Sequence, residues 1–198
     1  AICENLVRVG RLGDGGKWIC NPWKIKDWTH GCVIYSLGLD NRIDFDFQLQ
    51  NITGKKCELI GVDVKTQLES IVNQYRSIGG KIFITNLAES SGLGQTSFND
   101  LVARFGHKKI DILKMDIESA EYQLMDQIFK FPICQMMVEV HGSRKQFYNF
   151  LHAASLAGFY LVHYEINAGN MNACELTLVH ENCFDDFDVS IKLGKFLD

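Results

Sequence analysis

Three carboxylates follow an apolar run near the middle of the chain. Asp116, Glu118 and Glu121 come after residues 110–115, which read as a buried strand, and residues 120–131 carry apolar side chains at helical spacing. The acids therefore lie at the carboxyl end of a strand, the end that faces the ligand crevice in open α/β sheets. The structural alternative for Glu118 and Glu121 is that they stabilise a helix N-terminus through its dipole.

Two earlier strand ends carry residues suited to a nucleoside ligand. A dinucleotide fingerprint, G-x-G-x-x-G, is absent after residues 33–37, where Gly38 stands alone before Asp40. S-adenosylmethionine has no phosphate, so a single glycine for close approach with an acid beside it would suffice. Asp63 ends the next strand, where a carboxylate accepts hydrogen bonds from ribose hydroxyls. The alternatives are an ordinary turn for Gly38 and a helix cap for Asp63.

The spacing of the predicted strands sets the architecture. Strands are predicted to start at residues 33, 57, 81, 110, 134, 159 and 174, and the third ends at Asn86, a further candidate cofactor contact. The first five intervals leave room for crossover helices, which makes six strands parallel with helices on both faces. The last interval is too short for a helix, so the seventh strand returns antiparallel. This single Rossmann-like, mostly parallel α/β sheet is the pattern of class I methyltransferases.

One domain accounts for all 198 residues. Residues 1–31 form a Gly/Trp-rich loop region with little regular structure, residues 32–180 the Rossmann-like core and residues 181–198 a C-terminal tail. Lys17 follows a glycine cluster but is no P-loop lysine, because Trp18 comes next instead of Ser or Thr. Residues 43–49 do not settle between helix and strand.

Composition excludes several classes of function. Apolar residues make up 46% and charged residues 22%, as in soluble globular domains. The net charge of −4 and the lack of a basic run argue against nucleic acid as a partner. No apolar stretch is long enough to span a membrane. The chain starts without Met, so any upstream signal or anchor would not be visible in it.

Seven cysteines suggest an oxidising compartment. Cys57 and Cys134 open core strands and are expected to act as small buried hydrophobes. The other five lie in or beside loops and are candidates for disulfides: Cys3, Cys20, Cys32, Cys174 and Cys183. The triplet that starts at Asn51 is a glycosylation sequon. Together these features predict the secretory pathway, in the Golgi lumen or outside the cell.

Several segments resemble the methyltransferase-like 24 group, an animal branch related to FkbM-type methyltransferases. They are residues 13–18 with Cys20, residues 32–41, residues 113–121 and residues 138–141, and the resemblance extends from about Cys3 to His180. It implies a class I fold, S-adenosylmethionine as donor and oxygen methylation, often of sugar-like hydroxyls. Ser119 stands where FkbM proteins commonly have Gly.

Oxygen methylation of an alcohol needs a base, and His141 is the candidate because its ordinary pKa near 6.5 suits neutral pH. The alternative is a core or capping histidine. Asp116, Glu139 and His141 would also suit a divalent cation, Mg²⁺ or Mn²⁺, that lowers the pKa of the acceptor hydroxyl. Glu118 and Glu121 are expected to position the acceptor or cap the helix. The other histidines show no ligand spacing.

The sequence therefore predicts an S-adenosylmethionine-dependent O-methyltransferase of a glycan or small hydroxylated acceptor. Its cofactor contacts are expected at Gly38, Asp40, Asp63, Asn86 and Asp116, with Asp116 also catalytic beside Glu139 and His141. The alternative is a catalytically inactive secreted or Golgi domain that binds a carbohydrate or protein partner. A dehydrogenase is disfavoured by the missing glycines.

Overall fold

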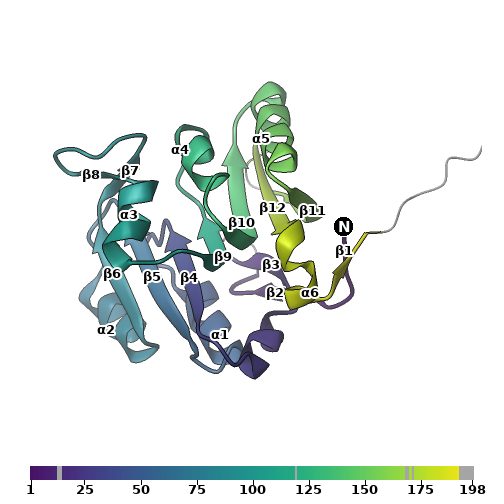
Figure 1. Ribbon diagram of the computed structural model, residues 1–198. Coiled ribbons are helices and arrows are strands. Elements are labelled where there is room, and N and C mark those ends of the chain that lie inside the picture. Colours follow the sequence, from purple (N-terminus) through teal and green to yellow (C-terminus); the bar gives the residue numbers. More distant parts are fainter. Residues whose placement is uncertain (13–14, 119, 168–169, 171, 192–198) are drawn as a thin grey trace, which may run out of the picture.

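The computed structural model describes residues 1–12, 15–118, 120–167, 170 and 172–191. Its centre is a seven-stranded sheet with the order β11-β12-β10-β9-β4-β5-β6 (Figure 1). The strands of this sheet are β4 (Cys32–Leu37), β5 (Cys57–Asp63), β6 (Gly80–Ile84), β9 (Ile110–Met115), β10 (Ile133–His141), β11 (Phe159–Ile166) and β12 (Ala173–His180).

Strand direction follows the predicted pattern. The neighbours from β10 through β9, β4 and β5 to β6 are all parallel, whereas β12 lies between β10 and β11 and runs antiparallel to both. The short link between β11 and β12 leaves no room for a crossover helix, so β12 has to return antiparallel. The predicted fold class is confirmed.

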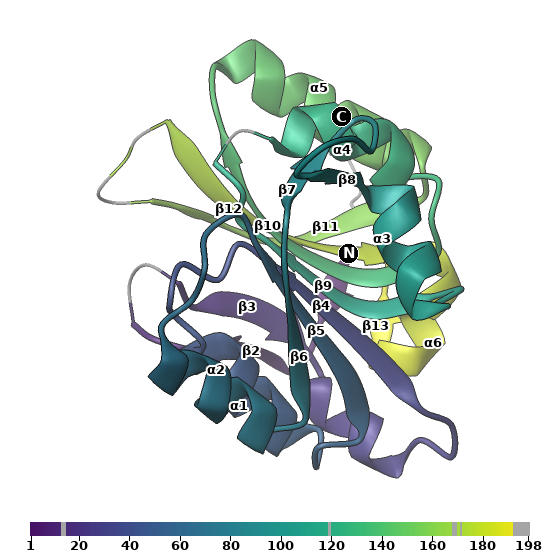
Figure 2. The ribbon, with the colours of Figure 1, turned by 90° about the vertical axis from the view of Figure 1, so that its left-hand side faces the viewer.

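Helices cover both faces of the sheet (Figure 2). One face carries α1 (Asp44–Ile52) and α2 (Glu69–Ser77), and the other carries α3 (Phe98–Phe105), α4 (Glu121–Ile128) and α5 (Arg144–Leu156). Residues 43–49, ambiguous in the sequence, belong mostly to α1, where Phe45 and Leu49 are buried and Phe47 is exposed. None of the described helices is long and apolar enough to cross a membrane.

The strands are apolar on both faces because each face packs under a separate layer. Leu113 and Met115 of β9 lie in the cluster that contains Leu101, Leu124 and Phe150 of the covering helices. Ile112, which directly precedes Leu113, lies in the cluster on the opposite side of the sheet. The near-continuous apolar run of β9 is thus that of a strand buried on both sides.

The N-terminal region is more regular than its sequence indicates, and the prediction of a loop region there is wrong. It contains β1 (Ile2–Cys3), the hairpin strands β2 (Leu6–Val9) and β3 (Lys17–Cys20), and the 3-10 helix η1 (Pro22–Asp27). The hairpin lies on the same side of the sheet as α1 and α2 (Figure 2). Strands of four residues on either side of a glycine cluster are too short to show a periodicity in the sequence.

The remaining elements are short. After β12 come η2 (Glu181–Cys183), α6 (Phe184–Phe187) and β13 (Val189–Ser190), and β13 pairs with β1 at the start of the chain. A small parallel pair, β7 (Asn86–Ala88) and β8 (Gln95–Ser97), leads into α3. Residues 192–198 of the expected tail lie outside the described residues.

Three disulfides join Cys3 to Cys20, Cys32 to Cys57 and Cys134 to Cys183. The expectation that Cys57 and Cys134 are unpaired core residues is therefore wrong, although both are buried. Cys57 lies directly opposite Cys32 in the β4–β5 ladder, and η2 brings Cys183 against β10. Cys174 is the free thiol.

Candidate active site

A cavity of about 570 Å³ opens at the carboxyl ends of the parallel strands. This volume is typical of small-molecule and cofactor sites. Residues from every parallel strand end line it, and most of the predicted site residues are among them: Gly38, Asp40, Asp63, Asn86, Asp116, Glu118, Glu139 and His141. The position agrees with the rule that open α/β sheets bind ligands at this edge.

Gly38 allows two strand ends to approach each other. Its φ is +82°, and a side chain here would collide with the carbonyl oxygen of Asp116. The buried Lys114 ammonium donates to the Gly38 carbonyl and so stabilises the turn. Only glycine accepts both the dihedral angle and the contact. The close approach of the two strand ends therefore requires glycine at position 38, whether or not a ligand is bound.

Asp63 orders the loop that contains Leu39 and Asp40. One carboxylate oxygen accepts from the Leu39 and Asp40 amides at 2.8 and 2.7 Å, and the other accepts from the Lys65 amide at 2.7 Å. Asp63 does not cap α2, which begins six residues later at Glu69 with no side-chain cap. The oxygen that accepts from Lys65 carries a single hydrogen bond, so it can accept a second one from a ribose hydroxyl.

The other two predicted cofactor contacts lie on the rim of the cavity. Asp40 has a φ of +43° and an exposed side chain 3.5 Å from the Lys65 ammonium. Asn86 is exposed at the start of β7, beside Thr85 and Leu87, which also line the cavity. Both offer hydrogen-bonding groups to a ligand.

Asp116, Glu139 and His141 meet as predicted. Asp116 follows directly after β9, while Glu139 and His141 share one face of β10. His141 Nε2 lies 3.4 Å from Glu139 Oε1. The three residues offer ligand atoms that all lie within 4.8 Å of one another. Their donor types suit Mg²⁺ or Mn²⁺.

Glu118 and Glu121 have different environments. Glu118 has a φ of +54° and an exposed side chain 3.7 Å from His141 Nε2. Glu121 begins α4, is fully buried, accepts from the Ile117 amide at 3.2 Å and lies 3.8 Å from His141 Nδ1. Burial raises the pKa of Glu121. Glu121 thus lies both at the start of α4 and next to His141. Ser119 lies outside the described residues.

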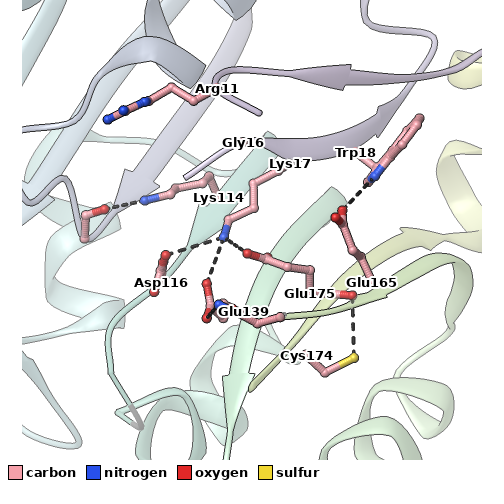
Figure 3. Close-up of polar contacts among 12 residues, drawn as sticks. Arg11, Gly16, Lys17, Trp18, Lys114, Asp116, Glu139, Glu165, Cys174 and Glu175 are labelled. Atoms are coloured by element: carbon pink, nitrogen blue, oxygen red, sulfur yellow. Dashed lines mark hydrogen bonds and ion pairs between the residues drawn. The ribbon is translucent and has the colours of Figure 1, made fainter. Parts of the chain in front are cut away.

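Lys17 belongs to this cluster, although no sequence pattern predicts a role for it. Its ammonium lies 3.4 Å from Asp116 Oδ2 and 3.3 Å from Glu139 Oε2, and it also contacts Glu175 of β12 (Figure 3). The Lys17 side chain is 1% exposed. It does not line the cavity, so its charge lies behind the carboxylates that do.

The protonation of this cluster follows from its burial and its charges. Burial acts to lower the pKa of Lys17, but Glu175, Asp116 and Glu139 outweigh it and raise that pKa. Burial is also the main cause that raises the pKa of Glu175 to about 8. For Glu139 burial is outweighed by hydrogen bonds from Glu175, Asn167 and Lys17, which lower its pKa to about 2. Near neutral pH, therefore, Lys17 is an ammonium, Glu139 a carboxylate and Glu175 a protonated acid.

One sequence signal could have pointed to Lys17. It is the charged residue at the end of a glycine cluster and is followed by Trp18 and Cys20, a pattern that excludes a P-loop but does not indicate which acids Lys17 contacts. No sequence signal points to Glu175, because a single acid within a predicted strand does not show which residue of the neighbouring strand it faces. Its position opposite Glu139 is a matter of strand register.

Comparison with known proteins defines the class. A family profile described as "Methyltransferase domain" matches residues 1–180. A probable methyltransferase-like protein 24 of Rattus norvegicus is 26% identical over 124 residues, which cover 57% of this chain and 34% of that protein. The match thus spans about a third of the length of this relative.

Solved structures share the fold. A fibrillarin of Aeropyrum pernix with natively bound S-adenosyl-L-methionine has a TM-score of 0.57 at 10% identity, over 90% of this chain and 84% of that one. The O-methyltransferase TomG of Streptomyces achromogenes, in complex with the same compound, has a TM-score of 0.50 at 9% identity, over 79% and 75% of the two chains. At such identities the likeness concerns the fold alone.

The fold and the position of the cavity define a class I, S-adenosylmethionine-dependent methyltransferase domain. The sheet has the strand order of that class, with the antiparallel strand inserted next to the edge. The chain belongs to the methyltransferase domain family, as the match to residues 1–180 shows.

Proposed function

We propose that this domain transfers a methyl group from S-adenosylmethionine to a hydroxyl oxygen of a glycan or small hydroxylated acceptor. The observation that carries the proposal is the placement of His141 at the cavity, 3.4 Å from Glu139 and within 4 Å of Glu118 and Glu121. A hydroxyl becomes a good nucleophile only as its proton leaves, and an imidazole at this place is suited to take the proton.

The donor site fits the chemistry of S-adenosylmethionine. Gly38 and Asp40 would face the amino-acid part, Asp63 would accept from the ribose and Asn86 would lie toward the base, with Asp116 at the boundary to the acceptor. When bound, S-adenosylmethionine supplies a methyl group on a sulfonium sulfur, which keeps the electron pair of the broken carbon–sulfur bond. The turn after β4 has the single glycine Gly38 instead of the G-x-G-x-x-G fingerprint of dinucleotide sites, which agrees with a donor that carries no phosphate.

His141 would take the acceptor proton at a ring nitrogen as the acceptor oxygen bonds to the methyl carbon. Carboxylates near both ring nitrogens stabilise the imidazolium that forms, as a positioned acid does beside a catalytic histidine. Glu118, exposed at the opening, is placed to accept from a second hydroxyl of the acceptor. Glu121 holds the loop through the Ile117 amide.

The acceptor side of the cavity favours neutral hydroxyl groups over phosphate. Asp116, Glu118 and Glu139 all line it, and Asn167 donates to Glu139 Oε1 at 3.1 Å. Carboxylates repel a phosphate backbone, whereas carboxylates and amides bind sugar hydroxyls well. This supports a glycan-like acceptor and argues against nucleic acid.

The three disulfides support a secretory location. Disulfides form and persist in oxidising compartments, and a Golgi or extracellular domain would keep all three. Asn51 of the sequon is exposed near the end of α1, whereas Thr53 is buried. Glycosylation at Asn51 stays a prediction.

A second candidate function is an inactive domain that binds a carbohydrate or protein partner. One observation favours it: the site acids already have partners within the chain. Asp63 accepts from three backbone amides, and Asp116 and Glu139 contact Lys17. A fold kept only for binding would retain these internal contacts.

Calorimetric titration with S-adenosylmethionine and with its demethylated product separates the two candidates. The enzyme requires binding of at least one of them, and a folded sample that gives no heat with either would exclude it. Incubation with methyl-labelled donor and a glycan array then identifies the acceptor. Label on an oxygen of a glycan supports the proposal, and label on protein nitrogen or on RNA contradicts it.

A further inference from the structure

The carboxylate cluster of the candidate site is organised around an ammonium group. Asp116, Glu139 and Glu175 come from three different strand regions, and Lys17 Nζ contacts all of them. Glu139 and Glu175 lie directly opposite each other on β10 and β12, and the Lys17 ammonium contacts both side chains. The ammonium is thus the counter-charge of the buried Glu139 carboxylate.

The hairpin that carries Lys17 is fixed to the same two strands. The Gln135 side chain of β10 both donates to and accepts from the Cys20 backbone, at 2.7 and 3.0 Å, and Thr177 of β12 donates to the Trp18 carbonyl at 2.7 Å. The Trp18 ring nitrogen donates to Glu165 at 2.9 Å (Figure 3). Two buried anchors and a disulfide at Cys20 hold Lys17 at a fixed depth.

We propose that the Lys17 ammonium is the resident cation of this cluster, in place of a divalent ion, and that it positions Asp116 and Glu139 for methyl transfer. A divalent ion bound to Asp116, Glu139 and His141 would share two carboxylates with Lys17. The ammonium already uses one oxygen of each, Asp116 Oδ2 and Glu139 Oε2. Two cations so close together repel strongly in a buried site.

Lys17 acts in this proposal as a positioning residue, because it does not line the cavity. It turns one oxygen of Glu139 away from the ligand and leaves the other, Oε1, to His141 and Asn167. Methyl transfer is then independent of added metal. The inference rests on the proposed function, and it replaces the divalent cation that the sequence predicts at Asp116, Glu139 and His141 with a group of the chain itself.

Binding of Mn²⁺ alone, followed by electron paramagnetic resonance, tests the proposal without an acceptor. Lys17→Met removes the charge, Lys17→Arg keeps it, and Lys130→Met removes an exposed lysine next to α4 as the matched control. The wild type, Lys17→Arg and Lys130→Met should leave Mn²⁺ free. Lys17→Met should bind it at least about tenfold more tightly than the wild type, because the repulsion by the ammonium is gone.

Two results would overturn the proposal. One is Mn²⁺ binding by the wild type that is lost in Asp116→Asn, and the other is a folded Lys17→Met that gains no Mn²⁺ affinity. Lys17→Gln, which keeps a polar head, replaces Lys17→Met if the latter does not fold. Calorimetric titration of the same samples with S-adenosylmethionine tests the proposed function separately from the role of Lys17. A wild type that does not bind S-adenosylmethionine would contradict the proposed function, whereas the Mn²⁺ result alone decides on Lys17.

Once an acceptor is identified, enzyme kinetics test the positioning role of Lys17. Lys17→Met should lower kcat while the affinity for S-adenosylmethionine stays within about threefold of the wild type, because Lys17 does not face the cavity. Lys17→Arg should restore most of the rate, and a chelator should leave wild-type turnover unchanged. Turnover that a chelator abolishes and Mn²⁺ restores would refute the inference.

Discussion

The Lys17 ammonium lies 3.3 Å from a carboxylate oxygen of Glu139, although 122 residues separate the two in the chain. A hairpin before the first core strand thus supplies the counter-charge for an acid at the end of β10. The contact ties the N-terminal segment to the edge of the sheet where the cavity opens. The N-terminal hairpin is accordingly part of the candidate site and more than a cover for the sheet.

Asp63→Ala should weaken binding of S-adenosylmethionine by about 1.5–3 kcal/mol, the cost of losing a buried hydrogen bond to a charged group. The variant should also lose some stability, because Asp63 orders Leu39 and Asp40. Calorimetry and urea unfolding measure the two effects separately. Asp126→Ala, an exposed acid on α4, is the control. Unchanged donor affinity in Asp63→Ala would reject the ribose assignment.

His141→Gln should reduce the rate of methyl transfer by roughly 10²–10⁴-fold, the usual contribution of a general base, with donor affinity retained. The substitution keeps a polar side chain of similar reach but removes the basic nitrogen. His152→Gln changes an exposed histidine on α5 and should have no effect. If His141→Gln transfers methyl groups at nearly the wild-type rate, His141 is not the general base and has only a structural role at the end of β10.

Asp46 should make stability depend on pH between about 4 and 6. It is buried, 3.2 Å from the Tyr75 hydroxyl, and burial raises its pKa from 3.8 to about 6, against the opposing effects of Lys114, Ser36 and Tyr75. Between these two values the folded chain keeps a proton that the unfolded chain has released. The free energy of unfolding should therefore fall as the pH rises through this window, by about 3 kcal/mol at most.

Asp46→Asn isolates this effect, because the amide keeps the shape and an acceptor for Tyr75 but does not titrate. Urea unfolding of both proteins from pH 4 to 7 gives two stability curves, and their difference contains the contribution of Asp46 alone. The difference should change sharply between pH 4 and 6 and be level above. A constant difference across the range would show that Asp46 has an ordinary pKa.

The disulfides should differ in their effect on stability. In the chain-entropy account a longer loop constrains the unfolded chain more, so Cys134–Cys183, with a separation of 49 residues, should contribute about 4 kcal/mol and Cys3–Cys20, with 17, about 3 kcal/mol. Paired Cys→Ala variants and urea unfolding measure both. Cys174→Ala is the control for losing a cysteine without a bridge.

Peptide mapping without reduction gives an independent result on the same pairs. It should find all three bridges and a thiol at Cys174. A bridge that includes Cys174, or a reactive thiol at Cys57 or Cys134, would contradict the pairing. Stability unchanged by loss of the Cys134–Cys183 bridge would show that its loop is already ordered in the unfolded chain.

Local sequence patterns predicted the strands that place Asp116 and Glu139, because a strand buried on both faces has to be apolar throughout. Gly38 and Asp63 could be placed for the same reason, as each ends such a strand. The hydrophobic pattern of residues 43–49 could not decide between helix and strand, and packing of Phe45 and Leu49 against the sheet decided it. Intervals between strands were enough to predict direction, since a crossover helix needs a minimum length.

The sequence by itself thus determined the fold class, the edge of the sheet that carries the cavity and the acids that line it. Only the tertiary structure decided which cysteines pair and which cation Asp116 and Glu139 face. Disulfide partners and the contact of Lys17 with Glu175 depend on strand order and register, and these arise from burial across the whole sheet. No local pattern encodes a contact between residues 17, 116, 139 and 175, because each belongs to a different element and only the complete fold brings them together.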